Sequence, residues 1–533
     1  MYNKFGYLII DLSFLKSTLE SSINIDFIMS KLAIVYSRAS CGLESPLISV
    51  ETHLSHGLPQ LAIVGLAEAS VKESKDRVRS AIINSGFEFP IRRITINLAP
   101  ADLPKNSGRF DLAIALGILA ASDQINSTEL YTYEFAGELA LSGQLRAFKG
   151  ALPFAIATNK SQRSLILPFD NADEAMLLRD NIVYAARDLK QVCQHLNKQK
   201  LMQQHKFVLP LVHDHASQNL DMQDIHGQPH AKRALEIAAA GGHSMLLIGP
   251  PGAGKTMLAS RLPSILPQLS LDEALEVTAI YSLGQTSINK EWLQRPFRNP
   301  HHTSSAIAMV GGGTIPKPGE VSFAHNGVLF LDELPEFARN VLEVMREPLE
   351  SGNIVIARAK GKIVFPCKFQ LIAAMNPCPC GQLNNLAHCC QCSQEQILRY
   401  QKKVSSPLLD RIDLHVDLPS LPTELLLQTS ESTQESSTLI RTRVIMARQL
   451  QLQRNKTLNH MLSNAAVKQL CVLNKDTKRL LQQAAEKLCL SARGFYRILK
   501  IARTIADLEN SVVIEKTHLT ESLGFRAKSR FFN

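Results

Sequence analysis

One eight-residue segment constrains the fold of this chain more than any other. Gly249-Pro-Pro-Gly-Ala-Gly-Lys-Thr256 follows the apolar run SMLLI and precedes MLASRLP, whose spacing predicts a helix. A glycine-rich turn between a buried strand and a helix lets backbone N–H groups surround a phosphate at the helix N-terminus. The segment therefore predicts an α/β core with a phosphate site formed by Gly249, Pro250, Pro251, Gly252, Ala253, Gly254, Lys255 and Thr256.

A second apolar strand supplies the acidic partner of that loop. Val328-Leu-Phe-Leu-Asp-Glu333 ends in two carboxylates, and ligands of α/β sheets bind at the carboxyl ends of the strands. Lys255 would reach the β- and γ-phosphates of ATP, and Thr256 and Asp332 would hold Mg²⁺. Glu333 would polarise the attacking water. The two segments together predict ATP hydrolysis with Mg²⁺ as cofactor.

Two further polar residues extend this site, each with an alternative. Asn376 ends the apolar strand that starts at Phe369, where it would orient water or the γ-phosphate; alternatively, it starts a turn before Pro377. Arg411, in LLDRID, would stabilise transition-state charge on a neighbouring subunit's γ-phosphate. Its alternative is a structural ion pair with Asp410 or Asp413, and the residues do not separate the two roles.

Charge and apolar patterning limit the partners and the compartment. The 533 residues carry 58 Lys plus Arg against 48 Asp plus Glu, a net charge of +10 that fits an anionic partner such as nucleic acid without requiring one. No stretch reaches the roughly 18 apolar residues of a membrane span, and the N-terminus lacks the pattern of a secretory signal. We expect a cytoplasmic protein without a membrane partner.

The pattern divides the chain into six parts. Residues 1–28 look detached from the strand pattern that follows, and they are either the product of a start codon placed too early or a short native helix. Residues 29–190 and 221–420 predict α/β domains, and 421–526 predict a helical domain. The polar segment 191–220 predicts a linker whose histidines face solvent, and 527–533 form a basic tail.

The motifs in order resemble an AAA+ ATPase module, and the strings RPFRNPHHTSSAIAMVGGGTIPKPGE and NIVIARAKGKIVFPCKFQLIAAMNPCPCG resemble the magnesium-chelatase-like ATPases of the YifB/ComM family. The resemblance runs from Met29 to about Arg526. It implies a P-loop α/β core with a C-terminal helical lid, a homo-oligomeric ring, a hexamer formed with nucleotide, and an Arg411 that acts in trans. It also implies that Arg493 is the γ-phosphate sensor of the lid.

The segment NIVIARAKGKIVF has a physical meaning of its own. Two alternating strands flank Arg358, Lys360 and Lys362, which would form a compact phosphate-binding tip. The alternative is that these cations only keep an exposed hairpin soluble. The family resemblance places the hairpin in the central pore of the ring and favours single-stranded or branched DNA as partner. Lys317, close to a triple glycine, is a further candidate for a pore residue.

Cysteines cluster after Asn376. Cys378 and Cys380 form one close pair, and Cys389, Cys390 and Cys392 follow. Four thiolates bind Zn²⁺ tetrahedrally, although these C-x-C pairs are tighter than the common C-x₂-C spacing, and the alternative is a loop of reduced surface cysteines. The family's second pair resembles Cys390 and Cys392, which leaves Cys389 outside. We expect a structural zinc site of Cys378, Cys380, Cys390 and Cys392.

The N-terminal domain resembles the Lon-protease-type (S5-type) α/β fold. A protease of that type needs a serine nucleophile and a lysine. Phe110 falls near the serine position and Ala151-Leu-Pro153 near the lysine position, although Ser107 and Lys149 lie close in register. We expect a non-proteolytic domain that serves as a DNA-binding or ring-building platform.

The family resemblance implies one function above the others. It is a ring-forming ATPase motor on DNA, a branch-migration helicase that promotes integration of DNA in natural transformation. The alternative is a chelatase-type, ATP-driven protein remodeller that does not use DNA, although the sequence contains no Asp-x-Ser-x-Ser metal motif. An ATP-dependent Lon-like protease is disfavoured because the Ser–Lys dyad is missing.

Overall fold

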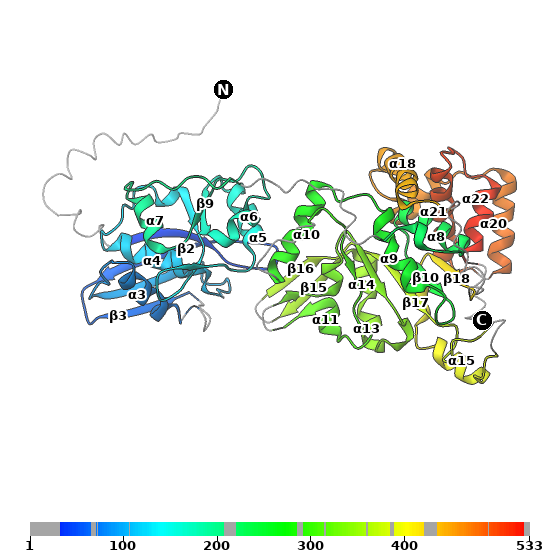
Figure 1. The fold of residues 1–533 in the computed structure, drawn as a ribbon, viewed down its shortest axis with the longest axis horizontal. Coiled ribbons are helices and arrows are strands. Elements are labelled where there is room, and N and C mark those ends of the chain that lie inside the picture. Colours follow the sequence, from blue (N-terminus) through cyan, green and yellow to red (C-terminus); the bar gives the residue numbers. More distant parts are fainter. Residues whose placement is uncertain are drawn as a thin grey trace, which may run out of the picture. The chain divides into compact units, whose positions relative to one another are not determined.

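The computed structural model describes residues 32–65, 71, 73–105, 107–206, 220–284, 292–313, 316–358, 361–383, 389–420, 434–488 and 490–526. Residues 1–28 and 527–533, expected as an extension and a basic tail, lie outside these ranges. The chain forms two compact units, Met1–Phe207 and Val208–Asn533 (Figure 1). Each unit has its own hydrophobic core, and the two are described separately.

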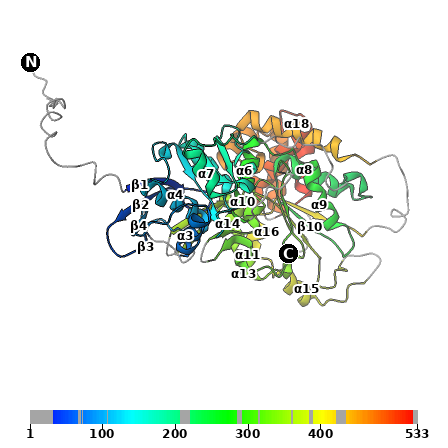
Figure 2. The same ribbon diagram turned by 60° about the vertical axis from the view of Figure 1, so that its left-hand side comes forward.

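The first unit is built on a mixed four-stranded sheet in the order β1-β2-β4-β3, whose strands lie side by side in Figure 2. The alternating buried and exposed residues of these strands turn one face to the core. Helix α4 is buried along its whole length because it packs across β1 and β2, and α3 packs beside it. The bounds are β1 Leu32–Arg38, β2 Leu47–Ser55, β3 Gln60–Val64, β4 Arg93–Ala99, α3 Ser74–Asn84 and α4 Asp111–Ala121.

A parallel three-stranded sheet in the order β5-β8-β9 completes this unit. Helices α5 and α6 pack together, and the apolar faces of these elements form a small separate core. A two-stranded hairpin, β6–β7, lies next to α4. The bounds are β5 Tyr133–Phe135, β6 Glu138–Leu139, β7 Leu145–Arg146, α5 Ala151–Lys160, β8 Ser164–Pro168, α6 Phe169–Ala175, β9 Val183–Ala186 and α7 Leu189–Leu196.

The segment 191–220, expected as a linker, differs from that expectation in its first half. Residues up to Leu196 complete α7, whose apolar residues enter the core of the first unit. Met202 is also buried in that core, and the backbone of His205 bonds to β9. His195, expected on the solvated surface, is buried, because its ring bonds to the backbone N–H of Met202 and contacts the Tyr133 hydroxyl. Residues 207–219 lie outside the described ranges.

The second unit is built on a five-stranded parallel sheet in the order β11-β14-β17-β10-β18. The central strands β10, β14 and β17 are buried throughout and, apart from Gln370 of β17, apolar, as expected for strands covered on both faces. Helices α8 and α9 pack together against it beside β10 (Figure 1). The bounds are α8 Pro229–Gly241, β10 Met245–Ile248, α9 Lys255–Ile265, β11 Phe297–Arg298, β14 Val328–Leu331, β17 Gln370–Met375 and β18 Leu414–Asp417.

Two antiparallel hairpins, β12–β13 and β15–β16, extend from this core with several short helices. The hairpin predicted from the alternating pattern is present, and Arg358 pairs with Gly361 at its tip. The bounds are α10 Leu271–Gly284, α11 Ala306–Val310, β12 Gly311–Gly312, β13 Lys317–Pro318, α12 Glu320–Phe323, α13 Arg339–Val344, α14 Arg346–Ser351, β15 Asn353–Arg358, β16 Gly361–Pro366, α15 Gln394–Gln401 and α16 Ser406–Leu409.

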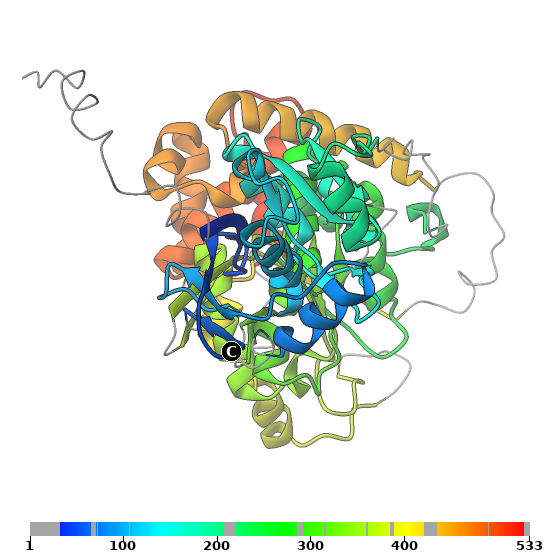
Figure 3. The same ribbon diagram turned by 90° about the vertical axis from the view of Figure 1, so that its left-hand side faces the viewer.

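The C-terminal part of the second unit is helical, and its orange and red helices form a group in Figure 3. Helices α18 and α21 join the core around α8 and β10, while the others share a smaller core of their own. Within the described residues no helix combines the length and apolar character needed to cross a bilayer. The bounds are α18 Ser437–Asn455, α19 Asn464–Leu470, α20 Lys475–Lys487, α21 Ala492–Leu508 and α22 Lys516–Gly524.

Candidate nucleotide-binding site

Three neighbouring strands bring the predicted residues to one edge of the parallel sheet. The loop 249–254 follows β10, Asn376 follows β17, and Asp332 with Glu333 follows β14. Strand β17 lies between β10 and β14, so Asn376 sits between the loop and the two carboxylates. This edge is the carboxyl end of the sheet, where ligands of parallel α/β sheets bind.

The loop has the shape of a phosphate cradle. Gly252 and Gly254 have φ angles of 78° and 86°, and a Cβ placed on either would meet nothing within 4 Å. Glycine adopts this left-handed conformation at no steric cost, and the open space leaves the N-terminus of α9 accessible to a phosphate. The left-handed glycines and the open space beside them therefore fit the phosphates of a nucleoside triphosphate.

Lys255 is held inside the loop. Its Nζ donates to the carbonyl oxygens of Gly249 at 2.6 Å and Pro250 at 2.9 Å, and to the Asn376 Oδ1 at 2.9 Å. Burial lowers the pKa of Lys255, and the nearby charges of Asp332 and Glu333 oppose that shift. The contact with Asn376 links the loop directly to the neighbouring strand.

The expected Mg²⁺ ligands also meet. The hydroxyl of Thr256, in the first turn of α9, donates to Asp332 Oδ2 at 2.7 Å. A hydroxyl and a carboxylate are hard oxygen donors, which suit Mg²⁺ bound together with substrate phosphates. The pair therefore fits the metal that the sequence implies.

Glu333 has a partner that sequence reasoning did not find. Its backbone is left-handed, with φ of 52°, and its carboxylate lies 2.9 Å from Nδ1 of His302. From the sequence, the adjacent histidines His301 and His302 predict a structural role, because neighbours on a strand point in different directions and rarely bind one metal together. They lie on the segment between β11 and α11. Only the placement of that segment beside the carboxyl end of β14 reveals the contact.

Arg411 and Arg493 lie together, away from the loop. Arg411 forms an ion pair with Glu350 of α14 instead of Asp410 or Asp413, and it also donates to the Pro407 carbonyl. Arg493, in the first turn of α21, is mostly exposed and lies 3.9 Å from the same Glu350. Arg411 precedes β18, whose amino end pairs with the amino end of β10, so both arginines lie near the edge of the sheet opposite the phosphate cradle.

Asp413 is not the partner of Arg411 because it belongs to a buried network between the sheet and the lid. Its carboxylate lies 3.2 Å from His243 and accepts from Arg497 of α21 at 2.7 Å. Burial acts to raise the pKa of Asp413, but the hydrogen bond from His243 and the charge of Arg497 outweigh it and leave that pKa well below its usual value. The network ties the lid to the start of β18.

The two basic hairpins touch each other. A Cβ placed on Gly311 of β12 would lie 3.1 Å from Cδ1 of Ile356 in β15. Lys317 and Lys362 are exposed on these hairpins. Lys360 lies outside the described residues, and of Arg358 only the backbone is described.

The four predicted cysteines converge. The Sγ atoms of Cys378, Cys380, Cys390 and Cys392 all lie within 4.8 Å of one another, and three of the separations are 3.4, 3.6 and 3.7 Å. A tetrahedral Zn²⁺ with Zn–S bonds of about 2.3 Å separates its sulfurs by about 3.8 Å. The donor set and its spacing therefore fit zinc, and Cys389 stands outside the group.

The chain is similar to known protein families and to several known proteins. Residues 221–426 match the family described as "Magnesium chelatase, subunit ChlI", 434–526 match "Magnesium chelatase, subunit ChlI C-terminal", and 50–171 match "Subunit ChlI of Mg-chelatase". Competence protein ComM of Haemophilus influenzae is 51% identical over 502 residues, which cover 94% of this chain and 98% of that protein. The YifB proteins of Salmonella typhimurium and Escherichia coli are 50% and 49% identical with the same coverage.

The chain belongs to the YifB/ComM family. Lon protease 2 of Bacillus subtilis is also similar, at 27% identity over 145 residues or 26% of this chain. In this member of the family Phe110, near the expected serine position, is fully buried. Arg109 donates from Nε to the Ser107 hydroxyl at 3.1 Å and from Nη2 to the Lys149 carbonyl at 2.7 Å. The buried guanidinium therefore contacts the side chain of Ser107 and the backbone of Lys149, whose side chain is exposed.

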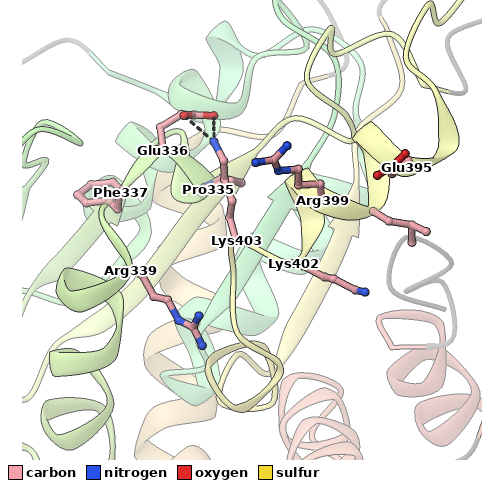
Figure 4. Close-up of a pocket in the computed structure, with 9 residues that line it drawn as sticks. Pro335, Glu336, Phe337, Arg339, Glu395, Arg399, Lys402 and Lys403 are labelled. Atoms are coloured by element: carbon pink, nitrogen blue, oxygen red, sulfur yellow. Dashed lines mark hydrogen bonds and ion pairs between the residues drawn. The ribbon is translucent and has the colours of Figure 1, made fainter.

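A basic pocket of about 750 Å³ opens beside the exit of β14 (Figure 4). Lys403 pairs with Glu336 at 3.0 Å across it, so part of its charge is neutralised. Helix α15, which follows the cysteine group, supplies one wall. The lining residues are Pro335, Glu336, Phe337, Arg339, Glu395, Leu398, Arg399, Lys402 and Lys403.

Proposed function

We propose that this protein is an AAA+ ATPase that binds MgATP at the carboxyl edge of the five-stranded sheet. Lys255 and the loop amides bind the phosphates, and Thr256 and Asp332 hold Mg²⁺, which neutralises charge developing on the phosphates. Glu333 orients and deprotonates the attacking water, while Asn376 holds the γ-phosphate between Lys255 and Glu333. The observation that carries this proposal is the convergence of Lys255, Asn376, Thr256 and Asp332 through hydrogen bonds of 2.7 to 2.9 Å.

The same site is completed by a second subunit. A parallel strand of four residues spans about 13 Å at roughly 3.3 Å per residue, so Arg411 and the phosphate cradle are separated by at least the length of β10. Arg411 and Arg493 therefore act on the nucleotide of a neighbouring subunit, for which Arg411 exchanges its ion pair with Glu350 for the γ-phosphate. The family resemblance implies that the subunits form a hexameric ring with nucleotide. In a ring each subunit gives two arginines to one side and a phosphate cradle to the other.

The motor acts on DNA. Lys317 and Lys362 are exposed on hairpins that touch each other, so a ring of subunits would line its pore with positive charge that tracks a phosphate backbone without reading bases. The name of the Haemophilus influenzae relative, "Competence protein ComM", supports a task in natural competence. We infer branch migration of recombination intermediates during natural transformation, in the cytoplasm.

Two structural roles belong to the same proposal. The first unit is non-proteolytic and serves as a platform for DNA binding or ring building, because the buried residues Phe110 and Ala151 to Pro153 stand near the positions of the serine and lysine that such a protease needs. The cysteine group holds a structural Zn²⁺, since four thiol groups meet at tetrahedral spacing.

The test is ATP hydrolysis by the purified protein, with and without forked or four-way DNA, beside the variant Glu333→Gln. We expect strong stimulation by DNA that is lost in the variant, while nucleotide binding is kept, because the substitution leaves the phosphate cradle and Asp332 intact. Hydrolysis that no form of DNA changes would refute the DNA motor and favour a chelatase-type remodeller of proteins.

A further inference from the structure

We propose that the zinc site is a brace for the nucleotide site, so that metal binding by the four cysteines sets the affinity for ATP. The proposal rests on the ATP-binding part of the proposed function and is independent of DNA. It starts from the position of Cys378, two residues after Asn376 and three residues after the end of β17. The cysteine group therefore begins where the γ-phosphate sensor ends.

The first contact between the two sites is a close approach of two turns. Gly381, one residue after Cys380, has φ of 76°, and a Cβ placed on it would lie 2.5 Å from Cδ of Pro251 and 3.7 Å from Cγ of Asn376. A separation under 3 Å leaves no room for a side chain, so the backbone of the cysteine turn rests directly on the phosphate loop. Movement of this turn displaces Pro251, the third residue of the loop.

The second contact runs through the sensor. Asn376 Oδ1 accepts from Nζ of Lys255 at 2.9 Å, and the backbone N–H of Gly249 bonds to the carbonyl of Met375 at 3.2 Å. The loop is therefore attached to the end of β17 at both of its ends. The cysteine group begins three residues after the end of β17, so the group fixes the direction in which the chain leaves this strand.

The third contact lies on the other side of the metal ligands. Cys392 is followed by Ser393, which caps α15 by accepting from the Gln396 N–H at 3.3 Å. At the end of α15 Gln401 donates to the carbonyl of Pro377 at 3.4 Å, and Tyr400 is buried in the core that contains Ile248 and Met375. The end of helix α15 thus contacts the segment that carries Asn376. The four sulfurs join the start of this helix to the same segment.

Zinc supplies the closure because no covalent bond does. The described sulfur separations of 3.4 to 3.7 Å are far longer than the roughly 2.05 Å of a disulfide. Cys380 is exposed and Cys390 and Cys392 are half-buried, so apolar packing is not what gathers them. Without the ion the cysteines take up protons and share no common ligand, so the turn on Pro251 would lose its support.

The experiment measures zinc and nucleotide binding on the full chain. The variants are Cys390→Ser and Cys392→Ser, with Cys389→Ser as matched control, because Cys389 is adjacent in sequence and outside the group. Zinc is released with an organomercurial and counted with a chromogenic chelator. Affinity is measured with a fluorescent, non-hydrolysable ATP analogue in the presence of Mg²⁺ and the absence of DNA.

We expect one zinc per chain in the native protein and in Cys389→Ser, with equal affinities. Cys390→Ser and Cys392→Ser should lose the zinc and bind the analogue about tenfold or more weakly, because small displacements of positioning groups are costly. Gly381→Ala should keep the zinc and still bind weakly, since its Cβ strikes Pro251. A zinc-selective chelator that spares Mg²⁺ should reproduce the loss in the native protein, and added zinc should reverse it, which separates the effect from misfolding.

Two results would overturn the proposal. One is a native protein that holds no zinc as purified and takes up none. The other is a zinc-free protein, made by chelation or by substitution, that binds the analogue as tightly as the zinc-loaded one. Failure of the zinc-loaded native protein to bind the analogue is a different outcome, which would refute the proposed nucleotide site and with it this brace.

Discussion

Replacing His302 tests whether its contact with Glu333 contributes to hydrolysis. In the structure Nδ1 of His302 lies 2.9 Å from Oε2 of Glu333, whose own backbone is in the left-handed region. A carboxylate that must orient water gains from a fixed partner, because positioning of the base relative to its proton governs the rate. We therefore predict that His302→Ala lowers kcat, with little change in the KM for ATP, since among the described residues the ion-pair partner of His302 is Glu333 and not the phosphate loop.

The structure sets the size of the effect. His302 and Glu333 form an ion pair when the histidine is protonated, and their side chains are 30% and 57% exposed. Exposed ion pairs contribute about 0.2 to 1 kcal/mol because solvent screens them. A loss of about 1 kcal/mol in transition-state stabilisation corresponds to about a fivefold fall in kcat.

The assay is steady-state ATP hydrolysis over a range of ATP concentrations, so that kcat and KM are obtained separately. His301→Ala is the matched control, because its ring bonds to Thr303 instead of Glu333. His302→Asn keeps a hydrogen-bond donor at the same place and should recover part of kcat. An unchanged kcat in His302→Ala would refute the positioning role, and a raised kcat would show that the histidine restrains the glutamate.

Three further predictions follow from other contacts. Mixing a Lys255→Ala chain with an Arg411→Ala chain, each inactive alone, should restore part of the ATPase rate, because some interfaces then combine an intact cradle with an intact arginine; a mixture that stays inactive contradicts action in trans. Lys362→Glu should lower DNA-stimulated hydrolysis and reduce the salt dependence of DNA binding, whereas Lys368→Glu, beyond the hairpin, should do neither. Equal effects of the two substitutions would show that the hairpin tip is not the DNA-binding element. Burial, followed by the charge of His243, lowers the pKa of His460 from 6.5 to about 4. The neutral histidine's contribution to the free energy of unfolding is therefore fully present above pH 6.5 and falls by about 2 kcal/mol at pH 5, because the unfolded chain takes up a proton that the folded chain does not. Thermal melting of the native chain and of His460→Gln at pH 7.5 and pH 5 measures this loss of stability, and an equal loss in both proteins would contradict the prediction.

The sequence was most informative where one strand and one loop define the chemistry. The phosphate loop, Asp332 and Asn376 were predictable because each follows an apolar strand, and the carboxyl ends of parallel strands share one edge. The cysteine group was predictable from its close spacing, and the structure brings its four sulfurs together. Short-range pattern was enough in each of these cases.

The rest depended on contacts between residues far apart in the chain. The position of β17 between β10 and β14, the ion pair of Arg411 with Glu350 and the contact of His302 with Glu333 all arise from tertiary packing. No local signal marks such partners, because a carboxylate on an exposed helix and a histidine pair on a connecting segment have many uses. Helix α7 was missed for a different reason: its eight residues are too few to stand out from a polar segment.

One hydrophobic cluster of the second unit packs the strands that carry the candidate nucleotide site against the hairpin β15–β16. Leu331 precedes Asp332, and Met375 precedes Asn376, and both are buried in the same hydrophobic cluster as Ile356 and Phe365 of the hairpin β15–β16. Close-packed interiors transmit displacement because side chains have little free volume in which to absorb it. In the proposed function, a shift of the carboxyl ends of β14 and β17 on loss of the γ-phosphate would therefore be passed to the hairpin through the packed side chains of this cluster.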